Sequence, residues 1–365
     1  MSSNTPAALV AEKLAIRFFQ EGNFTAASEL RGRHLDELAP ATAQSDTDLE
    51  PLFSESGFAG LAVQAVGYEE GGSEERVHVY VSKGARRAIQ QVPSSEGDVA
   101  IEVNKIGKLM IRPEQANSAG NRGHVFVRRD RIACGSSCAP SGESYSGTFG
   151  ALVRKGTGKD LYILSNNHVL AACNHTPVGM PILSPSNKDG GPTIEAPGEI
   201  GRHAEICELR SGEPTLVPPC QEDLALAKAL PDKVSSWQGD QQAGYDTPRK
   251  VRAPQSGVAV KKFGRTTGLT NGVLESRIAV MHPLPYKSKF FTATVWFRDV
   301  WVVRGVEGMA FALPGDSGSL VVTEDGQAAI GIVFASCAND YALLIPMNHA
   351  VTRFGGIQLV DKHGV

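Results

Sequence analysis

The sequence lacks the charge imbalance that marks a binder of polyanions. It contains 36 Lys and Arg against 39 Asp and Glu, which gives a formal net charge of −3 and a pI near 6.3. No basic stripe is present, which argues against nucleic acid or an anionic membrane as the main partner. A peptide or small-molecule partner stays open.

Long hydrophobic runs and a secretory leader are also missing. No stretch of about 18 consecutive apolar residues occurs in the chain. The N-terminal segment MSSNTPAALVAEKLAIRFFQEGN has no basic region followed by an unbroken apolar region. We therefore expect a soluble, cytoplasmic protein with no membrane partner.

Cysteine is scarce. Six cysteines in 365 residues are too sparse for a disulfide scaffold, which fits a reducing cytosol where thiols stay free. Two alternatives stay open, disulfides within the Cys134/Cys138 and Cys207/Cys220 pairs, and a zinc site made from Cys134, Cys138, Cys173 and His175. Neither CGSSC nor CNH has the two-residue spacing of strong zinc motifs, so we favour loop and core cysteines and expect no cofactor.

The length of the chain predicts one large domain and a smaller one. Residues 1–112 have the pattern of a small α/β module, with helical periodicity over residues 5–38, a short helix in ARRAIQQV and strand-like runs at residues 60–68, 76–82 and 99–107. This module contains no reactive constellation. We expect it to serve regulation, packing or partner binding.

The rest of the chain divides into two parts. Residues 113–147 are rich in Gly, Ser, Pro, Asn and Arg, which indicates a linker or a surface arm. Residues 148–365 contain short β-branched and aromatic runs separated by turns, such as FGALVRK, DLYILSNN and TVWFRDVWVV. Such runs are typical of an antiparallel barrel or sandwich, so the predicted fold class is mainly β, preceded by the small α/β domain.

The stretch PGDSGS, at residues 314–319, carries the most informative pattern. A tight turn would explain it, because glycine supplies positive φ and Asp and Ser bond their own backbone. It would also suit a nucleophile, Ser317, beside an oxyanion hole formed by the N–H groups of Gly315 and Ser317. The choice depends on whether the chain offers a matching base.

Among nine histidines, His168 stands at the end of a strongly β-like run, LYILSNNHVL, with apolar residues on both sides. Taken alone, it would more often be a structural histidine. Asp223 begins the apolar run EDLALAK, where an unpaired buried carboxylate would be costly and a bond to His168 would remove that cost. Together with Ser317, these residues favour a catalytic triad.

The motifs NNHVL, EDLALAK and GDSGSL, in the order His, Asp, Ser on a β-rich frame, resemble the trypsin/chymotrypsin-like serine peptidases. More narrowly, GTFGALV, YILSNNHVLA, KKFGRTTGLTNG and PGDSGSLVV look like the intracellular bacterial trypsin-like peptidases. The similarity covers roughly residues 124–356, and the preceding module is similar to the N-terminal region of the same group. It implies a chymotrypsin-like double antiparallel β-barrel with the triad in the cleft between the barrels.

The resemblance also implies roles for individual residues. His168 would be general base and then acid, Asp223 its orienting partner and Ser317 the nucleophile, with Gly315 completing the oxyanion hole. Residues 331–336 would pair with substrate backbone, and a pocket position falls at Phe311. The substrate-binding candidates are Phe311, Ala312, Leu313, Ile332, Val333, Phe334, Ala335 and Ser336. They predict an apolar or small residue before the cut, rather than Arg or Lys.

The chain departs from the secreted members of that family near the nucleophile. There the Asp before the serine pairs with an N-terminus freed by zymogen cleavage, but no obvious basic cleavage signal of that type precedes GTFGALV. Asp316 must therefore find another partner, or the site awaits activation. Val169 replaces a usual cysteine, which suits a cytosolic protein. For KKFGRTTGLTNG we favour a hairpin with a solvated Arg265 over a direct part in the chemistry.

The leading prediction is a serine endopeptidase that acts on a protein or peptide substrate through an acyl-enzyme. We expect it to be regulated, to act on a dedicated partner and to serve bacterial antiviral defence. The alternative is a protease-fold binding or scaffold protein with a silent triad. An esterase is disfavoured, because GDSGS follows β segments rather than a strand that leads into a helix. The sequence leaves a homo-oligomer open.

Overall fold

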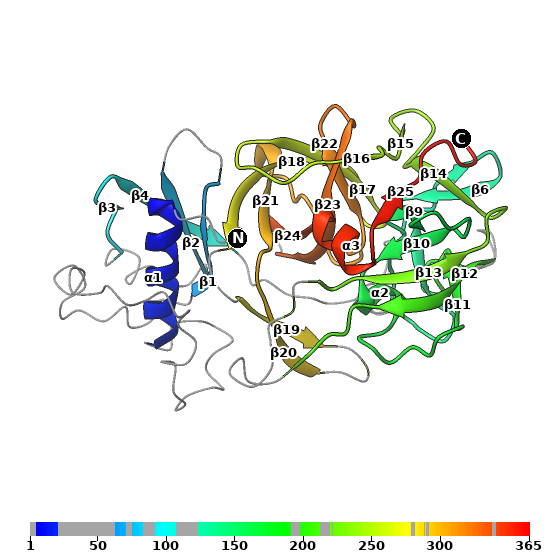
Figure 1. The fold of residues 1–365 in the computed structure, drawn as a ribbon, viewed down its shortest axis with the longest axis horizontal. Coiled ribbons are helices and arrows are strands. Elements are labelled where there is room, and N and C mark those ends of the chain that lie inside the picture. The colour runs from blue at the N-terminus through cyan, green and yellow to red at the C-terminus, as the bar shows by residue number, and fades with distance from the viewer. Residues whose placement is uncertain are drawn as a thin grey trace.

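The computed structural model describes residues 5–20, 63–70, 75–82, 92–106, 123–190, 198–211, 220, 222–278, 282–287, 289, 292–337 and 341–365. Within these ranges the chain is mainly β, with four sheets and few helices. Figure 1 shows a small part with one long helix beside a larger β-rich body. The predicted fold class, a chymotrypsin-like double β-barrel preceded by a small α/β part, is confirmed.

The small N-terminal part consists of one helix on a sheet. Helix α1 (Pro6–Gln20) buries Ala7, Ala11, Leu14 and Phe18, which recur every three or four positions and form one stripe against the strands. The strands are β1 (Val63–Tyr68), β2 (Arg76–Ser82), β3 (Ser95–Glu96) and β4 (Val99–Ile106). The first predicted helix and the three predicted strands are confirmed. The second helical run and residues 85–91 of the predicted short helix lie outside the described residues.

The first sheet of the β-rich body has eight strands in the order β25, β9, β10, β13, β12, β11, β7, β8. Its strands are β7 (Ser137–Pro140), β8 (Gly147–Thr148), β9 (Ala151–Lys155), β10 (Tyr162–Ser165), β11 (Pro181–Ser184), β12 (Gly198–Ile206), β13 (Ala225–Ala229) and β25 (Ile357–Leu359). Side chains alternate between two cores. Ile163 and Ala227 pack within this sheet, whereas Leu164 and Leu226 join a larger cluster shared with the second barrel.

The second barrel is closed. Its strands follow the order β17, β22, β23, β24, β21, β18, and β18 pairs back with β17. They are β17 (Ala259–Gly264), β18 (Gly268–Ile278), β21 (Trp301–Gly305), β22 (Leu320–Thr323), β23 (Ala328–Ser336) and β24 (Tyr341–Pro346), and helix α3 (Met347–Arg353) follows. Closure pairs the backbone groups of every strand on both sides over most of its length.

Shorter strands complete the body. A four-stranded sheet contains β5 (Val127–Arg128), β6 (Arg131–Cys134), β14 (Val234–Gln238) and β15 (Tyr245–Asp246). Strand β16 (Lys250–Val251) runs parallel to β23. Between β18 and β21, strands β19 (His282–Lys287) and β20 (Thr292–Phe297) form a separate hairpin, which lies at the lower edge of the body in Figure 1.

The prediction of a linker or surface arm over residues 113–147 is wrong for its described part. Residues 123–147 contribute β5 to β8, and Cys134, Ser137 and Ala139 are buried. The small residues permit close packing instead of marking exposure. A Cβ at Gly147, for example, would lie 2.4 Å from a methyl carbon of Val169. Residues 113–122 lie outside the described residues.

The N-terminal sheet continues the sheet of the second barrel. Gly67 and Tyr68 of β1 pair antiparallel with Ile278 and Arg277 of β18. The Arg277 guanidinium also lies 3.1 Å from a Glu70 carboxylate oxygen and 2.5 Å from one of Asp299. Backbone and charge pairing therefore join the small part to the body.

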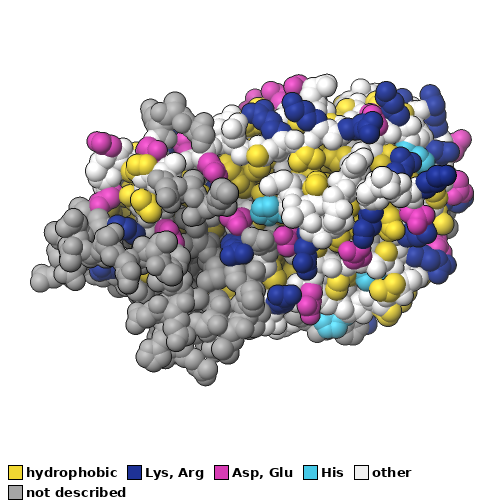
Figure 2. All heavy atoms as spheres, in the orientation of Figure 1, with side chains coloured by type: hydrophobic (Ala, Val, Ile, Leu, Met, Phe, Trp, Pro, Cys, Tyr) yellow, Lys and Arg dark blue, Asp and Glu magenta, His cyan; other side chains and the backbone are white. Residues whose placement is uncertain are grey.

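The surface and the cysteines add little that is unusual. On the face shown in Figure 2, acidic and basic side chains are interspersed over the β-rich body. All six cysteines are buried and carry free thiols. No helix in the described ranges is both long enough and apolar enough to span a bilayer.

Candidate active site

His168 lies just after the end of a central strand of the first sheet. Strand β10 ends at Ser165, and the single-turn helix α2 (Asn167–Leu170) follows. The Asn166 side chain donates to the main-chain oxygen of Asp223 at 2.7 Å, which ties this turn to the start of β13. His168 therefore lies in a short helical turn directly after the strand, close to the strand end where the sequence analysis placed it.

The structure brings His168 and Asp223 together. The imidazole Nδ1 lies 2.5 Å from Asp223 Oδ2, and the His168 main-chain N–H donates to Asp223 Oδ1 at 3.1 Å. Both side chains are fully buried. A buried carboxylate needs such partners, because desolvation penalises an isolated charge by several kcal/mol. The pair can fix the imidazole tautomer and stabilise an imidazolium.

Asp223 has a further partner that the sequence analysis missed. The hydroxyl of Tyr286, on β19, donates to Asp223 Oδ2 at 2.7 Å. Burial and the nearby carboxylate raise the pKa of Tyr286 well above its usual value, so the hydroxyl keeps its proton and remains a donor. No sequence pattern around HPLPYK points to this role, since the contact depends on where the hairpin folds.

Ser317 is placed by a glycine turn. Gly315 and Gly318 have φ angles of +99° and +98°, which favour glycine. A Cβ at Gly318 would lie 2.1 Å from Ser165 Oγ and 2.3 Å from the Thr148 carbonyl oxygen. The turn after Ser317 therefore packs directly on the end of β10, just before His168. The turn that carries Ser317 and the strand end that precedes His168 therefore lie in contact.

Ser317 is not hydrogen-bonded to His168. Its Oγ donates to the Phe334 carbonyl oxygen at 3.4 Å, and the His168 Nε2 is buried with no hydrogen-bond partner among the described residues. Ser317 as a whole residue is 9% exposed, whereas His168 is fully buried. Union of the three groups requires rotation of the serine side chain toward His168.

The backbone of the turn leaves two donors available. Among the described residues, neither the Gly315 N–H nor the Ser317 N–H donates to a protein acceptor. The Gly315 carbonyl is held by Thr148 Oγ1 at 2.9 Å, and the Ser317 carbonyl by the Thr148 N–H at 2.8 Å. Thr148 therefore fixes the outer side of the turn. The two N–H groups that were predicted as oxyanion donors are therefore available to donate to a ligand oxygen.

Asp316 finds its partner within the barrel. Its carboxylate lies 3.4 Å from Lys262 Nζ, and both side chains are fully buried. It also accepts hydrogen bonds from the N–H groups of Thr266, Thr267 and Leu313. The ammonium of Lys262, rather than a freed N-terminus, thus neutralises this acid. Burial lowers the pKa of Lys262, and the Asp316 carboxylate opposes that shift.

The expectation of a solvated Arg265 is wrong, although KKFGRTTGLTNG does form the predicted β17–β18 hairpin. The guanidinium is fully buried and binds both carboxylate oxygens of Asp189. Asp189 also accepts hydrogen bonds from three serine hydroxyls, those of Ser137 at 2.5 Å, Ser146 at 2.7 Å and Ser186 at 3.2 Å. A complete set of partners makes the burial of this arginine tolerable.

The predicted substrate-binding residues divide into two groups. Phe311 and Ala312 are buried in the core of the second barrel, and Leu313 is half-buried. Ile332 of β23 pairs with both β22 and β24, and the Gly318 N–H donates to the Val333 carbonyl at 2.8 Å. Within the described residues, only Phe334, Ala335 and Ser336 of β23 lack a strand partner on the Ser317 side. A peptide could pair there, and not along residues 331–333.

The candidate zinc ligands do not form a site. Cys134 and Cys138 belong to the core of the first sheet, whereas Cys173 lies in the cluster shared by the two barrels. His175 Nδ1 lies 2.7 Å from the main-chain oxygen of Cys173. No group of three or more His, Cys, Asp or Glu in the described part of the chain is arranged to hold a metal ion.

Comparison with known proteins gives a similarity of fold alone. No family model and no curated protein matches the chain. Similar solved structures include Thermobifida fusca protease A, with 19% identity over 63% of this chain and 99% of that chain and a TM-score of 0.40. A glutamic acid-specific serine protease that uses a histidine triad in substrate binding is 18% identical over 63% of this chain and 100% of that chain, with a TM-score of 0.42.

Cellulomonas bogoriensis chymotrypsin is 17% identical over 62% of this chain and 97% of that chain, with a TM-score of 0.39. Identities and TM-scores of this size carry no argument about activity, so the chemistry must be argued from the site itself. The narrower resemblance to intracellular bacterial peptidases stays a prediction. The structural neighbours are trypsin/chymotrypsin-like serine proteases.

Proposed function

We propose that this protein is a serine endopeptidase that works through an acyl-enzyme. The observation that carries the proposal is the buried pair of His168 and Asp223, packed against a glycine turn that presents Ser317 and two available N–H donors. The His168 Nε2 has no hydrogen-bond partner among the described residues. It is therefore available to take a proton, as a general base must.

The reaction follows from the positions of these groups. Ser317 Oγ turns from the Phe334 carbonyl toward His168 and attacks the substrate carbonyl carbon, while His168 Nε2 takes the hydroxyl proton. The carbonyl π electrons move to oxygen, which the Gly315 and Ser317 N–H groups stabilise. The C–N bond then breaks, and His168 gives the proton to the leaving amine. Water hydrolyses the ester by the same steps, with His168 again as base and then acid.

The proposal extends to substrate and regulation. The unpaired edge at residues 334–336 suits an extended peptide, which would add a strand there by main-chain hydrogen bonds. We propose a protein or peptide substrate, a dedicated partner and a role in bacterial defence. Because Asp316 already pairs with Lys262, the proposed regulation would not act through a freed N-terminus at this acid. Cytoplasmic location, preference for an apolar residue before the cut, and oligomeric state stay predictions.

A fluorophosphonate probe tests the proposal directly, because it requires an activated serine and no knowledge of the substrate. We expect covalent labelling of wild type at Ser317, mapped by peptide mass spectrometry. Ser317→Ala should abolish labelling, and His168→Ala should reduce it severely while Ser317 remains. A folded wild-type protein that the probe leaves unlabelled at every concentration, both alone and after addition of partner proteins or limited proteolysis, would contradict the proposal.

One observation favours a second candidate, a binding or scaffold protein with a silent triad. Ser317 Oγ faces Phe334 instead of His168, so the described arrangement is not the reactive one. A silent protein would remain unlabelled alone and also after addition of partner proteins or limited proteolysis. An enzyme that awaits activation would become labelled after one of these treatments.

A further inference from the structure

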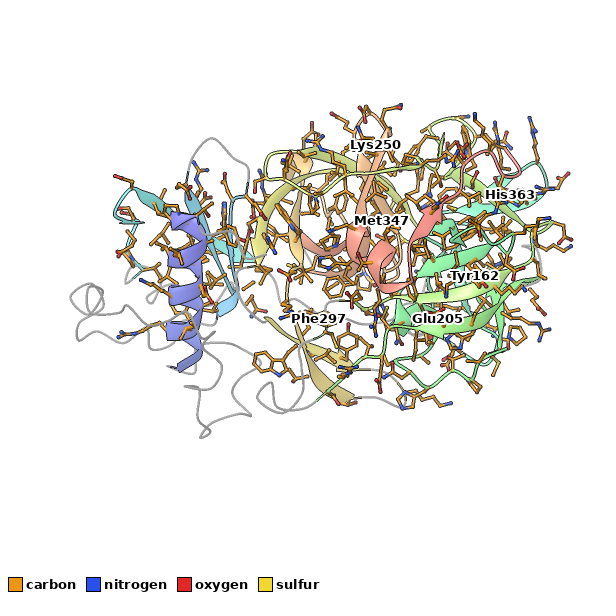
Figure 3. All side chains as sticks on the ribbon, in the orientation of Figure 1. Tyr162, Glu205, Lys250, Phe297, Met347 and His363 are labelled. Atoms are coloured by element: carbon orange, nitrogen blue, oxygen red, sulfur yellow. The ribbon has the colours of Figure 1, made fainter. Side chains whose placement is uncertain are left out.

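The hairpin of β19 and β20 is an excursion from the second barrel. Strands β18 and β21 are antiparallel neighbours, which a short turn could connect. Instead, the described part of the chain between them forms a separate two-stranded sheet, β19 with β20. Figure 3 labels Phe297, which lies where this hairpin meets the β-rich body. The hairpin brings side chains next to His168 and Asp223, which together form the base half of the proposed site; Ser317 and its turn form the nucleophile half.

Tyr286 is the hairpin side chain that reaches Asp223. Its hydroxyl donates at 2.7 Å to Oδ2, the same oxygen that bonds His168 Nδ1. The ring is 2% exposed and meets the His168 imidazole edge-on, with ring centres 6.2 Å apart at 78°. Tyr286 therefore contacts both Asp223 and His168.

The hairpin also holds the backbone that leads to Asp223. The Cys220 N–H donates to the Trp296 carbonyl at 2.7 Å, and the Cys220 carbonyl accepts from the Arg298 N–H at 3.1 Å. Cys220 precedes Asp223 by only three residues. These bonds are independent of the Tyr286 hydroxyl and place the hairpin and the acid in fixed register.

An aromatic series connects Tyr286 with the nucleophile half. Tyr286 stacks on Phe297 with centres 6.0 Å apart, and Phe297 packs on Phe334 at 5.0 Å. Phe334 is the residue whose carbonyl accepts the Ser317 hydroxyl, and its own side chain offers no donor to Asp223. The side-chain hydroxyl that donates to Asp223 is that of Tyr286, on the hairpin.

We propose that Tyr286 is a positioning residue of the triad, which holds the Asp223 carboxylate in the orientation that His168 requires. This inference rests on the proposed function. The hydroxyl fixes the rotation of the carboxylate and withdraws part of its charge. Without it, the carboxylate rotates more freely, and the charge left on it attracts the imidazolium proton more strongly. Orientation is lost while the basicity of His168 increases.

The test is the fluorophosphonate labelling rate of full-length Tyr286→Phe, measured across pH. A hydrogen bond to a charged group predicts a second-order rate about tenfold lower than wild type. The acidic limb of the profile should move to higher pH. A residue that merely filled space would lower the rate without moving this limb.

Tyr80→Phe is the matched control. Tyr80 is also buried and donates to a carboxylate, that of Glu275 at 2.5 Å, but it lies in the N-terminal part. Its loss should leave the labelling rate and the pH profile as in wild type. Equal effects from both tyrosines would overturn the inference.

A second readout separates this inference from the proposed function. The NMR signal of the proton in the short contact between His168 Nδ1 and Asp223 Oδ2 needs no activity, and in a Ser317→Ala background Tyr286→Phe should shift it. An unlabelled wild type in which Tyr286→Phe shifts this signal would contradict the peptidase but support the placement of Tyr286. An unchanged signal together with a wild-type labelling rate would overturn the inference.

If Tyr286→Phe fails to fold, Phe297→Leu takes its place. This substitution keeps the hydroxyl and loosens the ring that supports it, so the acidic limb should move by a smaller amount in the same direction. A folded Phe297→Leu protein with the profile of wild type would count against the hairpin as a support of Asp223.

Discussion

The two halves of the proposed site are held by different means. His168 and Asp223 are joined by direct hydrogen bonds between fully buried side chains. Ser317 is placed by the backbone of a turn, above an ion pair between Asp316 and Lys262. The base half is already assembled, whereas the nucleophile half still requires rotation of Ser317. The difference suggests that any switch in this protein acts on the nucleophile half.

The largest effect should come from a break in the base half. Asp223→Asn keeps the shape of the side chain but cannot stabilise an imidazolium, and it favours the wrong imidazole tautomer. We expect kcat to fall about 10⁴-fold with a peptide substrate found by screening. Circular dichroism should show an unchanged fold. A variant within about tenfold of wild type would mean that Asp223 has no such role.

The next effect concerns the charge below the nucleophile. Lys262→Met removes the counter-charge of the buried Asp316 carboxylate together with the N–H donors, which the neutral amine at high pH would keep, and we expect the free energy of unfolding to fall by about 3–5 kcal/mol. Lys261→Met is the matched control, because the adjacent Lys261 lies over the Tyr245 ring and is only half-buried. That change should cost about 1 kcal/mol or less. Similar urea unfolding curves for the two variants would mean that Lys262 does not stabilise the folded protein as the partner of Asp316.

The pH dependence sharpens the same contrast. Burial lowers the pKa of Lys262 from 10.5, so its charge and its pair with Asp316 are lost as the pH rises through a value below that of an exposed lysine. We expect the labelling rate of Ser317 to decline over this alkaline range. Lys262→Arg should keep a protonated partner and extend labelling to higher pH. An alkaline limb that is identical in wild type and Lys262→Arg would refute the assignment of that limb to Lys262.

Stability should move in the opposite direction over that range. The unfolded chain keeps the Lys262 proton up to about 10.5, while the folded protein has already released it. The unfolded state therefore binds more protons, and this group raises the free energy of unfolding as the pH increases. Comparison of urea unfolding of wild type and Lys262→Arg at several alkaline pH values isolates this contribution.

The smallest effect should come from Thr148→Val. Its hydroxyl donates to the Gly315 carbonyl at 2.9 Å and accepts from the Arg265 N–H at 3.1 Å, so its loss loosens the oxyanion turn from outside. We expect a labelling rate about fivefold lower, as for one neutral hydrogen bond. The NMR signal of the proton between His168 Nδ1 and Asp223 should stay as in wild type. A shift of that signal would show that the two halves are coupled through Thr148.

The sequence predicted best where the backbone alone determines position. A histidine at a strand end and an acid at the start of the next run were expected to meet, and His168 and Asp223 do lie in contact. The glycine turn was expected around Ser317, and its positive φ angles agree. The catalytic roles of these residues stay predictions until the serine is labelled.

The sequence predicted worst where polar side chains are buried. Lys262 and Arg265 carry charges that usually remain in water, and only the positions of Asp316 and Asp189 in the folded chain explain their burial. The alternation of side chains along KKFG did offer one signal, since adjacent strand residues face opposite sides and one of the two lysines had to point inward. Tyr286 offered none, because its contact depends on a long excursion of the chain.

The pairing of β1 with β18 makes the N-terminal part a cover for an edge. Removal of residues 1–112 would uncover the main-chain groups of Arg277 and Ile278, which pair with β1 in the full-length protein. A shortened protein built from the β-rich body alone would then present a strand that another copy can extend. Aggregation of such a product would therefore report an unprotected margin of the sheet, and would say nothing about the competence of the serine.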